Sequence, residues 1–184
     1  MNYLMLVNKN NRLNKDYVPD NLTVVKNRKG DKPNLILLLD KVVYKKFLEM
    51  VKVAYNDGYD IICDSAYRSY DYQEKLYKEL LKSKKDISYL AKPGESEHQT
   101  GLCVDIAAYQ KGRYVDDPRK LEKEYKWLFN NSFKFGFILR YPKGKRHITG
   151  YPYEPWHFRY VGVLAATRIM NEGITLEEYL GKVG

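Results

Sequence analysis

The stretch SEHQTGLCVDI, residues 96–106, places an acid inside what otherwise reads as a buried strand. Side chains alternate between the two faces of a strand. One face here is apolar and comprises Leu102, Val104 and Ile106. The other face carries small residues and the acid, namely Gly101, Cys103 and Asp105. A carboxylate is costly to bury without a partner, so this pattern predicts a binding partner for Asp105.

His98, one of only three histidines, stands just before this strand. Gly101 allows the backbone to bend, so the imidazole of His98 and the carboxylate of Asp105 can converge on one point. A converging histidine and acid indicate a pair of metal ligands. The alternative is a structural strand in which Asp105 caps a nearby helix or pairs with an arginine.

The stretch GYPYEPWHFRY, residues 150–160, supplies Glu154 and His157, with Trp156 between them. Two histidines and an aspartate form a catalytic zinc set, because three ligands leave the fourth tetrahedral position open. We therefore predict a Zn²⁺ site whose ligands are His98, Asp105 and His157. Glu154 is then the general base, which takes a proton from water activated by the metal.

We do not expect the third histidine or the two cysteines to bind the metal. His147 lies in the basic, turn-rich stretch GKRHITG, where we expect a solvated loop residue and not a ligand. Cys63 and Cys103 are too few for a disulfide framework, and each falls in an expected buried strand. We expect both to act as small buried hydrophobic side chains.

The chain has 184 residues, which is enough for one domain with a substantial core. We expect a single domain over residues 1–184, with the polar residues 1–32 as an N-terminal arm. No stretch approaches the ~20 apolar residues of a membrane span. The apolar part of the opening MNYLMLVNKNNRL is too short for a signal peptide, so we expect any leader or anchor to be absent from this chain. The net charge of +9 favours polyanions: nucleic acid, acidic lipid or the anionic polymers of a bacterial wall.

The first half of the chain shows four clear helix and strand patterns. In the arm, NLTVV reads as a short strand. A helix with apolar residues at Val43, Phe47, Met50 and Ala54 is expected between a cap at Asp40 and Gly58. The buried strand in YDIICDSAYRS then runs through Arg68 into a helix over 71–83, for which Asp71 and Glu74 are spaced as a capping box.

The second half continues the mixed order. A lysine-rich loop over 82–95 leads into the first motif, and Pro118 starts a helix that runs through Phe129. FGFILRY is a strand that begins after Gly136, and a last long helix covers about 161–170. Thr175 and Glu178 form another capping box. This order predicts an α+β fold with a small, mostly antiparallel sheet flanked by helices, and with the zinc site on the sheet.

The motifs resemble those of a known family. Ser96, His98, Gly101 and Asp105, followed by Glu154, Trp156 and His157, match the S-x-H-x-x-G-x-A-x-D and E-x-W-H signatures of zinc D,D-peptidases of the M15 group. DSAYRSYDYQ, RYPKGKRHITGYPYEPWHFRYVG and LVNKNNRL resemble its VanY-type D-alanyl-D-alanine carboxypeptidase branch, and the likeness covers most of the chain. Cys103 stands where the signature usually has alanine, which places a thiol near the metal; we do not expect a fourth ligand there.

The resemblance assigns the same ligands and base, and it adds substrate contacts. The arginine of the strand-to-turn motif, Arg68, meets the substrate in that family. A guanidinium recognises a terminal carboxylate through two charge-assisted hydrogen bonds, although Arg68 would equally stabilise the oxyanion, and its structural alternative is a surface salt bridge. Ser96 binds substrate backbone or caps the loop, Gln73 lines the pocket or faces solvent, and Trp156 forms a wall of the site or packs in the core.

The resulting functional hypothesis is a zinc carboxypeptidase that removes a terminal D-alanine from peptidoglycan stem peptides, with L,D-specificity left open. We expect it at the extracytoplasmic face of a bacterial envelope, with anionic wall polymers as further partners and no nucleic acid. One alternative is a phage-type zinc endolysin that cuts within the stem peptide. The other is a noncatalytic wall-binding module, which would not require Arg68 or Glu154.

Overall fold

The computed structural model describes residues 2–26, 36–83 and 86–182. Its central layer is an antiparallel sheet of five strands. Four strands lie in the order β3 (Asp60–Ser65), β4 (Cys103–Gln110), β7 (His157–Tyr160) and β6 (Phe137–Leu139), and β5 (Arg113–Val115) pairs with β4. A separate antiparallel pair consists of β1 (Leu22–Val24) and β2 (Leu38–Asp40). The predicted α+β fold with a small antiparallel sheet is confirmed.

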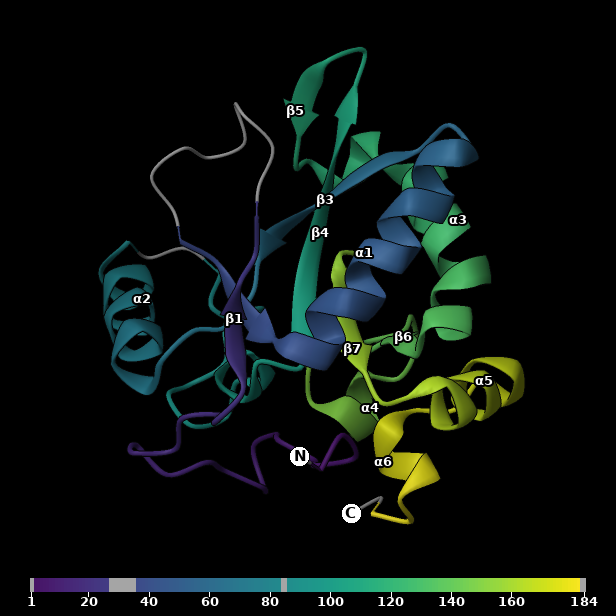
Figure 1. Ribbon diagram of the computed structural model, residues 1–184. Helices are drawn as coiled ribbons and strands as arrows, with labels where there is room; N and C mark the ends of the chain where they lie inside the picture. The colour runs from purple at the N-terminus through teal and green to yellow at the C-terminus, as the bar shows by residue number, and fades with distance from the viewer. Residues whose placement is uncertain (1, 27–35, 84–85, 183–184) are drawn as a thin grey trace.

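Six α-helices and three 3₁₀ turns occur in the described part of the chain. The α-helices are α1 (Lys41–Asn56), α2 (Tyr70–Lys82), α3 (Glu122–Asn131), α4 (Arg146–Thr149), α5 (Val163–Glu172) and α6 (Leu176–Tyr179). The 3₁₀ turns are η1 (Glu97–Thr100), η2 (Pro118–Lys120) and η3 (Ser132–Phe135). In Figure 1, α1 and α3 run along the right of β4, α2 lies on its left, and both chain ends lie at the bottom beside α6.

Helix α1 follows the predicted pattern at both ends. The side chain of Asp40 accepts hydrogen bonds from the backbone N–H groups of Val42 and Val43 at 2.8 and 3.2 Å, as an N-cap does. The helix ends at Asn56, two residues before Gly58. Its buried residues are the predicted set Val43, Phe47, Met50 and Ala54. This face belongs to the main hydrophobic core together with the apolar residues of β4.

The capping box predicted at the start of α2 is wrong. The N-cap is Ser69, whose side chain accepts the backbone N–H of Tyr72, and the helix begins one residue earlier than expected, at Tyr70. Asp71 lies inside the first turn, where a negative charge still stabilises the helix N-terminus. The predicted connection is confirmed, because β3 leads through Arg68 directly into α2.

Strand β4 has the predicted two faces. Leu102, Val104 and Ile106 belong to the main core, each 2 % exposed or less. Gly101 ends η1 with φ of +67°, a left-handed conformation that glycine adopts without strain. A Cβ atom there would lie 2.8 Å from a methyl group of Leu22, so β1 packs directly on this turn.

The C-terminal half agrees with most of the predicted elements. Pro118 opens the short turn η2, and the longer helix α3 begins only at Glu122. Strand β6 follows Gly136, and the capping box of Thr175 and Glu178 is present at the start of α6. Cys63 and Cys103 are both buried, on β3 and β4.

The described N-terminal residues 2–26 contact the rest of the protein at several points. The backbone N–H of Leu13 donates to the carbonyl of Gly94, and Gln99 donates to the carbonyls of Asn14 and Tyr17. The rest of the predicted arm, residue 1 and residues 27–32, lies outside the described residues, as do residues 84 and 85 of the expected loop. Within residues 2–26, 36–83 and 86–182, no helix has the length and apolar character to span a bilayer.

Candidate active site

Three elements bring the predicted metal ligands together. Strands β4 and β7 are neighbours, and their register pairs Asp105 with His157 directly. His98 lies in η1, whose left-handed end at Gly101 turns the chain back into β4. The two motifs, about fifty residues apart in the chain, therefore meet at one edge of the β4–β7 pair.

Both predicted histidine ligands lie at hydrogen-bonding distance from the carboxylate of Asp105. Nε2 of His98 lies 3.2 Å from Oδ2 of Asp105, and Nδ1 of His157 lies 2.9 Å from Oδ1 of Asp105. Donor atoms around a tetrahedral zinc ion are separated by about 3.3 Å, given bonds of about 2.0–2.1 Å. The two distances to Asp105 are close to this value, so the donor set fits a zinc ion.

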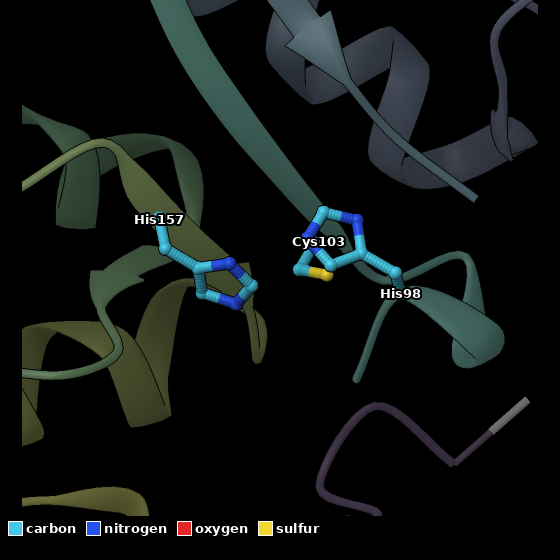
Figure 2. A group of neighbouring side chains, drawn as sticks. All are labelled: His98, Cys103 and His157. Carbon is cyan, nitrogen blue, oxygen red and sulfur yellow. The ribbon is translucent and has the colours of Figure 1, made fainter. Parts of the chain in front are cut away.

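Cys103 belongs to the same cluster. Figure 2 shows the side chains of His98, Cys103 and His157 directed toward one another. Their ligand atoms all lie within 4.8 Å of each other, and all three residues are buried. The predicted thiol beside the metal site is thus present, on the same face of β4 as Asp105.

The electrostatics of the metal-free cluster centre on Asp105. Burial alone would raise the pKa of Asp105, but His98 and His157 outweigh it and hold this pKa well below its usual range. Burial and Arg68 both oppose protonation of His98, yet Asp105 and Cys103 raise its pKa to about 8. Asp105 therefore stays ionised between the two imidazoles, and a metal ion that binds here would displace protons from its histidine ligands.

Glu154 lies in the connection that precedes β7. It is 5 % exposed, and its backbone N–H donates to the carbonyl of Tyr141. Burial raises the pKa of its carboxyl group from 4.5 to about 7, against smaller opposing effects of His157 and His98. A carboxyl group with this pKa, next to metal ligands, has the property expected of a general base or acid near neutral pH.

Arg68 lies between β3 and α2 and is held by a hydrogen bond from its backbone N–H to the carbonyl of His98. It lines the same cavity as the three predicted metal ligands and Glu154. Nε of this guanidinium is buried and has no hydrogen-bond partner within the described residues. The surface salt bridge that we considered for Arg68 is therefore absent from the described structure, and the guanidinium is available to an anionic group in the cavity.

The other predicted residues take different positions. Ser96 caps η1 by accepting the N–H of His98 and also lines the cavity. Gln73 is buried, and its amide donates at 2.7 Å to the carbonyl of Ala91, which lines the cavity; Gln73 itself is not among the lining residues. Trp156 lines the cavity and packs against Tyr89, with ring centroids 6.0 Å apart. His147 is exposed, as expected, but it lies on helix α4 and not in a loop, and the cluster of His98, Cys103 and His157 does not include it.

The site consists of a small cavity beside a large groove. The cavity has a volume of about 110 Å³ and is lined by the three predicted metal ligands, Glu154 and Arg68. The groove has a volume of about 930 Å³ and runs over α3 and the connection before β7. Tyr89 and Trp156 line both, so the cavity opens beside the groove.

Glu97 is a site residue that the sequence interpretation missed. Its carboxylate lies 3.5 Å from Nε2 of His157 and pairs with two buried arginines, Arg140 and Arg159. Burial would raise the pKa of Glu97, but the two arginines and His157 hold it far below its usual range. The available signal was the pair of arginines inside the apolar stretches FILRY and HFRY, because a buried arginine requires an acidic partner.

Two histidines and a carboxylate that could hold a metal ion, beside a buried acid and an arginine in one cavity, are typical of the class of metal-dependent hydrolases. The comparison with protein families narrows this class. The family profile VanY, D-alanyl-D-alanine carboxypeptidase, matches residues 37–163. The chain belongs to this family.

Individual relatives agree with the family. The bifunctional D-Ala-D-Ala dipeptidase and D-Ala-D-Ala carboxypeptidase VanXYC of Enterococcus gallinarum is 36 % identical over 97 % of this chain and 94 % of its own length. A D-alanyl-D-alanine carboxypeptidase of Enterococcus faecalis is 41 % identical over 72 % of this chain. The match covers 52 % of that relative, so the chain spans about half of its length.

Two solved structures show the same fold. The LD-carboxypeptidase LdcB, described in terms of peptidoglycan recognition, has a TM-score of 0.84 and 37 % identity, with 100 % of this chain and 87 % of that one covered. A mutant of the vancomycin resistance D,D-pentapeptidase VanY, solved in complex with Zn(II), has a TM-score of 0.80 and 34 % identity. That match covers 98 % of this chain and 99 % of the other.

Proposed function

We propose that this protein is a zinc carboxypeptidase that removes the C-terminal D-alanine from peptidoglycan stem peptides. The observation that carries the proposal is the guanidinium of Arg68, which lines the cavity of the predicted metal ligands and whose buried Nε has no hydrogen-bond partner among the described residues. A site built for chain ends needs a cation for the terminal carboxylate, whereas an endopeptidase has no terminal carboxylate to bind.

The volumes of the cavity and of the groove indicate the same direction of substrate binding, with the C-terminal residue of the peptide in the cavity. A cavity of about 110 Å³ is well below the roughly 300–1,000 Å³ of sites that enclose a whole ligand, so it accepts only a short side chain. The neighbouring groove of about 930 Å³ is large enough for the body of the peptide. The terminal residue would lie against Arg68, and the remaining peptide would pass Trp156 into the groove.

The zinc ion would be held by His98, Asp105 and His157. When bound, it supplies Lewis acidity that polarises the scissile carbonyl and lowers the pKa of water. Glu154 accepts the proton of the attacking water on a carboxylate oxygen. It then delivers that proton to the nitrogen of the departing D-alanine as the C–N bond breaks, so no covalent enzyme intermediate is required.

The same relatives support the proposed place of action. LdcB is described in terms of peptidoglycan recognition, and peptidoglycan lies outside the cytoplasmic membrane. We therefore propose action in the bacterial envelope, where the net charge of +9 would favour contact with anionic wall polymers.

Mass spectrometry of products from defined tripeptide, tetrapeptide and pentapeptide stems tests the proposal. We expect the zinc-loaded protein to release one D-alanine from the pentapeptide, and we expect chelation to abolish this and added zinc to restore it. Release from the tetrapeptide alone would make the enzyme an L,D-carboxypeptidase. New internal amino termini would identify an endopeptidase, and wall binding without any cleavage would identify a noncatalytic module.

A further inference from the structure

Glu97 precedes His98 in the chain, but its carboxylate faces the other histidine. Oε2 of Glu97 lies 3.5 Å from Nε2 of His157, and Glu97 and His157 are 1 % and 3 % exposed. Neither of these two atoms has a hydrogen-bond partner in the described part of the chain. Buried polar atoms rarely remain unsatisfied, so a donor and an acceptor that face each other here are one small movement from a hydrogen bond.

Two arginines hold Glu97 in this orientation. Nε of Arg140 and Nη1 of Arg159 both donate to Oε1 of Glu97, at 2.8 and 2.7 Å. Both guanidinium groups are fully buried, so these charge-assisted bonds form without competition from water. The arginines occupy one carboxylate oxygen and leave the other directed at His157.

The arginines are themselves anchored to distant parts of the chain. Arg140 forms two further hydrogen bonds with Glu177 of α6, at 2.9 and 2.6 Å. Arg159 donates to the backbone carbonyls of Tyr3 and Met5 at 3.1 and 2.7 Å. The position of Glu97 is thus fixed from both ends of the chain, and not only by its own turn.

We propose that Glu97 is a positioning residue of the metal centre, which accepts the Nε2–H of His157 so that this ring presents Nδ1 to the ion. The proposal rests on the metal site of the proposed function. His98 is arranged the opposite way, because its Nδ1 contacts the carbonyl of Ala66 and leaves Nε2 facing Asp105. The two histidines therefore bind through different nitrogens, and each has its own partner behind the ring.

Zinc affinity, measured by competition with a chromogenic chelator, tests this role in Glu97→Gln. An amide has a single acceptor oxygen, and if the arginines take it, the NH₂ group faces His157. Loss of a partner behind a ligand typically weakens metal binding by about 10–100-fold, and we expect a change in that range. Glu95→Gln is the matched control, because Glu95 is 2 % exposed and pairs with Arg12 at 2.7 Å, away from the histidines.

A second control separates the histidine contact from general stability. Glu177→Gln weakens the anchoring of Arg140 but keeps the carboxylate of Glu97 and its bond from Arg159, so it should lower the free energy of unfolding and weaken zinc binding much less than Glu97→Gln does. Zinc affinity in folded Glu97→Gln equal to wild type would overturn the proposal. Equal weakening in Glu95→Gln and Glu177→Gln would overturn it as well, because the effect would then be one of stability.

Nitrogen NMR of the zinc-loaded protein reports the orientation directly. In the wild type we expect the His157 ring proton on Nε2 and that of His98 on Nδ1; a ring proton on Nδ1 of His157 would overturn the proposal. If Glu97→Gln does not fold, Glu97→Asp retains both acceptor oxygens but withdraws them by one methylene, and it should also bind zinc more weakly. None of these readouts requires turnover, so an inactive protein that binds zinc would refute the proposed function and leave the role of Glu97 intact.

Discussion

The carboxyl group of Glu154 has an energetic cost that follows from its burial. Burial raises its pKa from 4.5 to about 7 in the metal-free protein. The folded state then binds a proton more tightly than the unfolded state, so stability falls as pH rises from 4.5 to 7, and the full cost is present above pH 7. One pKa unit corresponds to about 1.4 kcal/mol, so the ionised carboxylate costs roughly 3 kcal/mol.

Glu154→Gln removes the charge and retains the size of the side chain. We expect the metal-free variant to be more stable than metal-free wild type by roughly 3 kcal/mol at neutral to alkaline pH, and by little at pH values below the ordinary pKa of a glutamate. Guanidinium chloride denaturation of chelator-treated protein across this pH range measures the difference. Glu79→Gln, at an exposed position of α2, is the control, and its stability difference should not change with pH in this way.

The same variant should bind zinc and lose turnover. General acid–base groups contribute about 10²–10⁴ in rate, and Glu154 would serve two proton transfers, so a loss near the upper end is expected. A stability difference that does not grow with pH would refute the argument that Glu154 is buried at a cost. A zinc-loaded variant with more than about a tenth of wild-type turnover would refute its role as general base.

The remaining predictions concern the metal and the substrate carboxylate. His157→Ala should lose stoichiometric zinc in elemental analysis, whereas His147→Ala should retain it; zinc retained in the first or lost in the second would contradict the ligand set. Arg68→Ala should lose about 2–5 kcal/mol of transition-state stabilisation on a free-acid peptide and should no longer distinguish it from the C-terminal amide; equal discrimination in both enzymes would limit Arg68 to the oxyanion or to structure. We do not expect the thiol of Cys103 as a ligand, so the absorption spectrum of cobalt-loaded wild type should lack a thiolate-to-cobalt charge-transfer band and should match that of Cys103→Ala. A near-ultraviolet band that is lost in Cys103→Ala and kept in Cys63→Ala would show that Cys103 is a ligand. Zinc binding should release protons, and zinc affinity should fall as pH falls below about 8, the pKa of His98 without the metal. Calorimetry in buffers of different ionisation enthalpy measures the number of protons released.

The elements that the sequence predicted correctly depend on interactions within a few residues. Asp40 caps α1 by bonding N–H groups two and three residues ahead. The two faces of β4 follow from the period of a strand, and the capping box of α6 spans Thr175 to Glu178. Such short-range chemistry is visible in the sequence, because the partners are neighbours in the chain whatever the rest of the fold does.

The start of α2 shows where short-range reasoning becomes ambiguous. Ser69 and Asp71 are both good N-cap residues, and the spacing of Asp71 to Glu74 favoured the second. In the structure the backbone of Arg68 is bonded to the carbonyl of His98, which fixes where the chain leaves β3. Ser69 is therefore in extended conformation at the helix start, and the choice between the caps came from a contact with a distant turn.

The predicted metal ligands could be found from the sequence, whereas the acid behind His157 could not. His98, Asp105, Glu154 and His157 occur in two compact motifs, so their spacing alone predicts a shared centre. Arg140 and Arg159 indicate that acids must be buried near β6 and β7, but several glutamates of the chain meet that requirement equally well in the sequence. Only the pairing of β7 with both β4 and β6 brings the two arginines to the same oxygen of Glu97. The chemistry of the ion thus determines which residues can be ligands, whereas the packing of the sheet determines which acid stands behind His157.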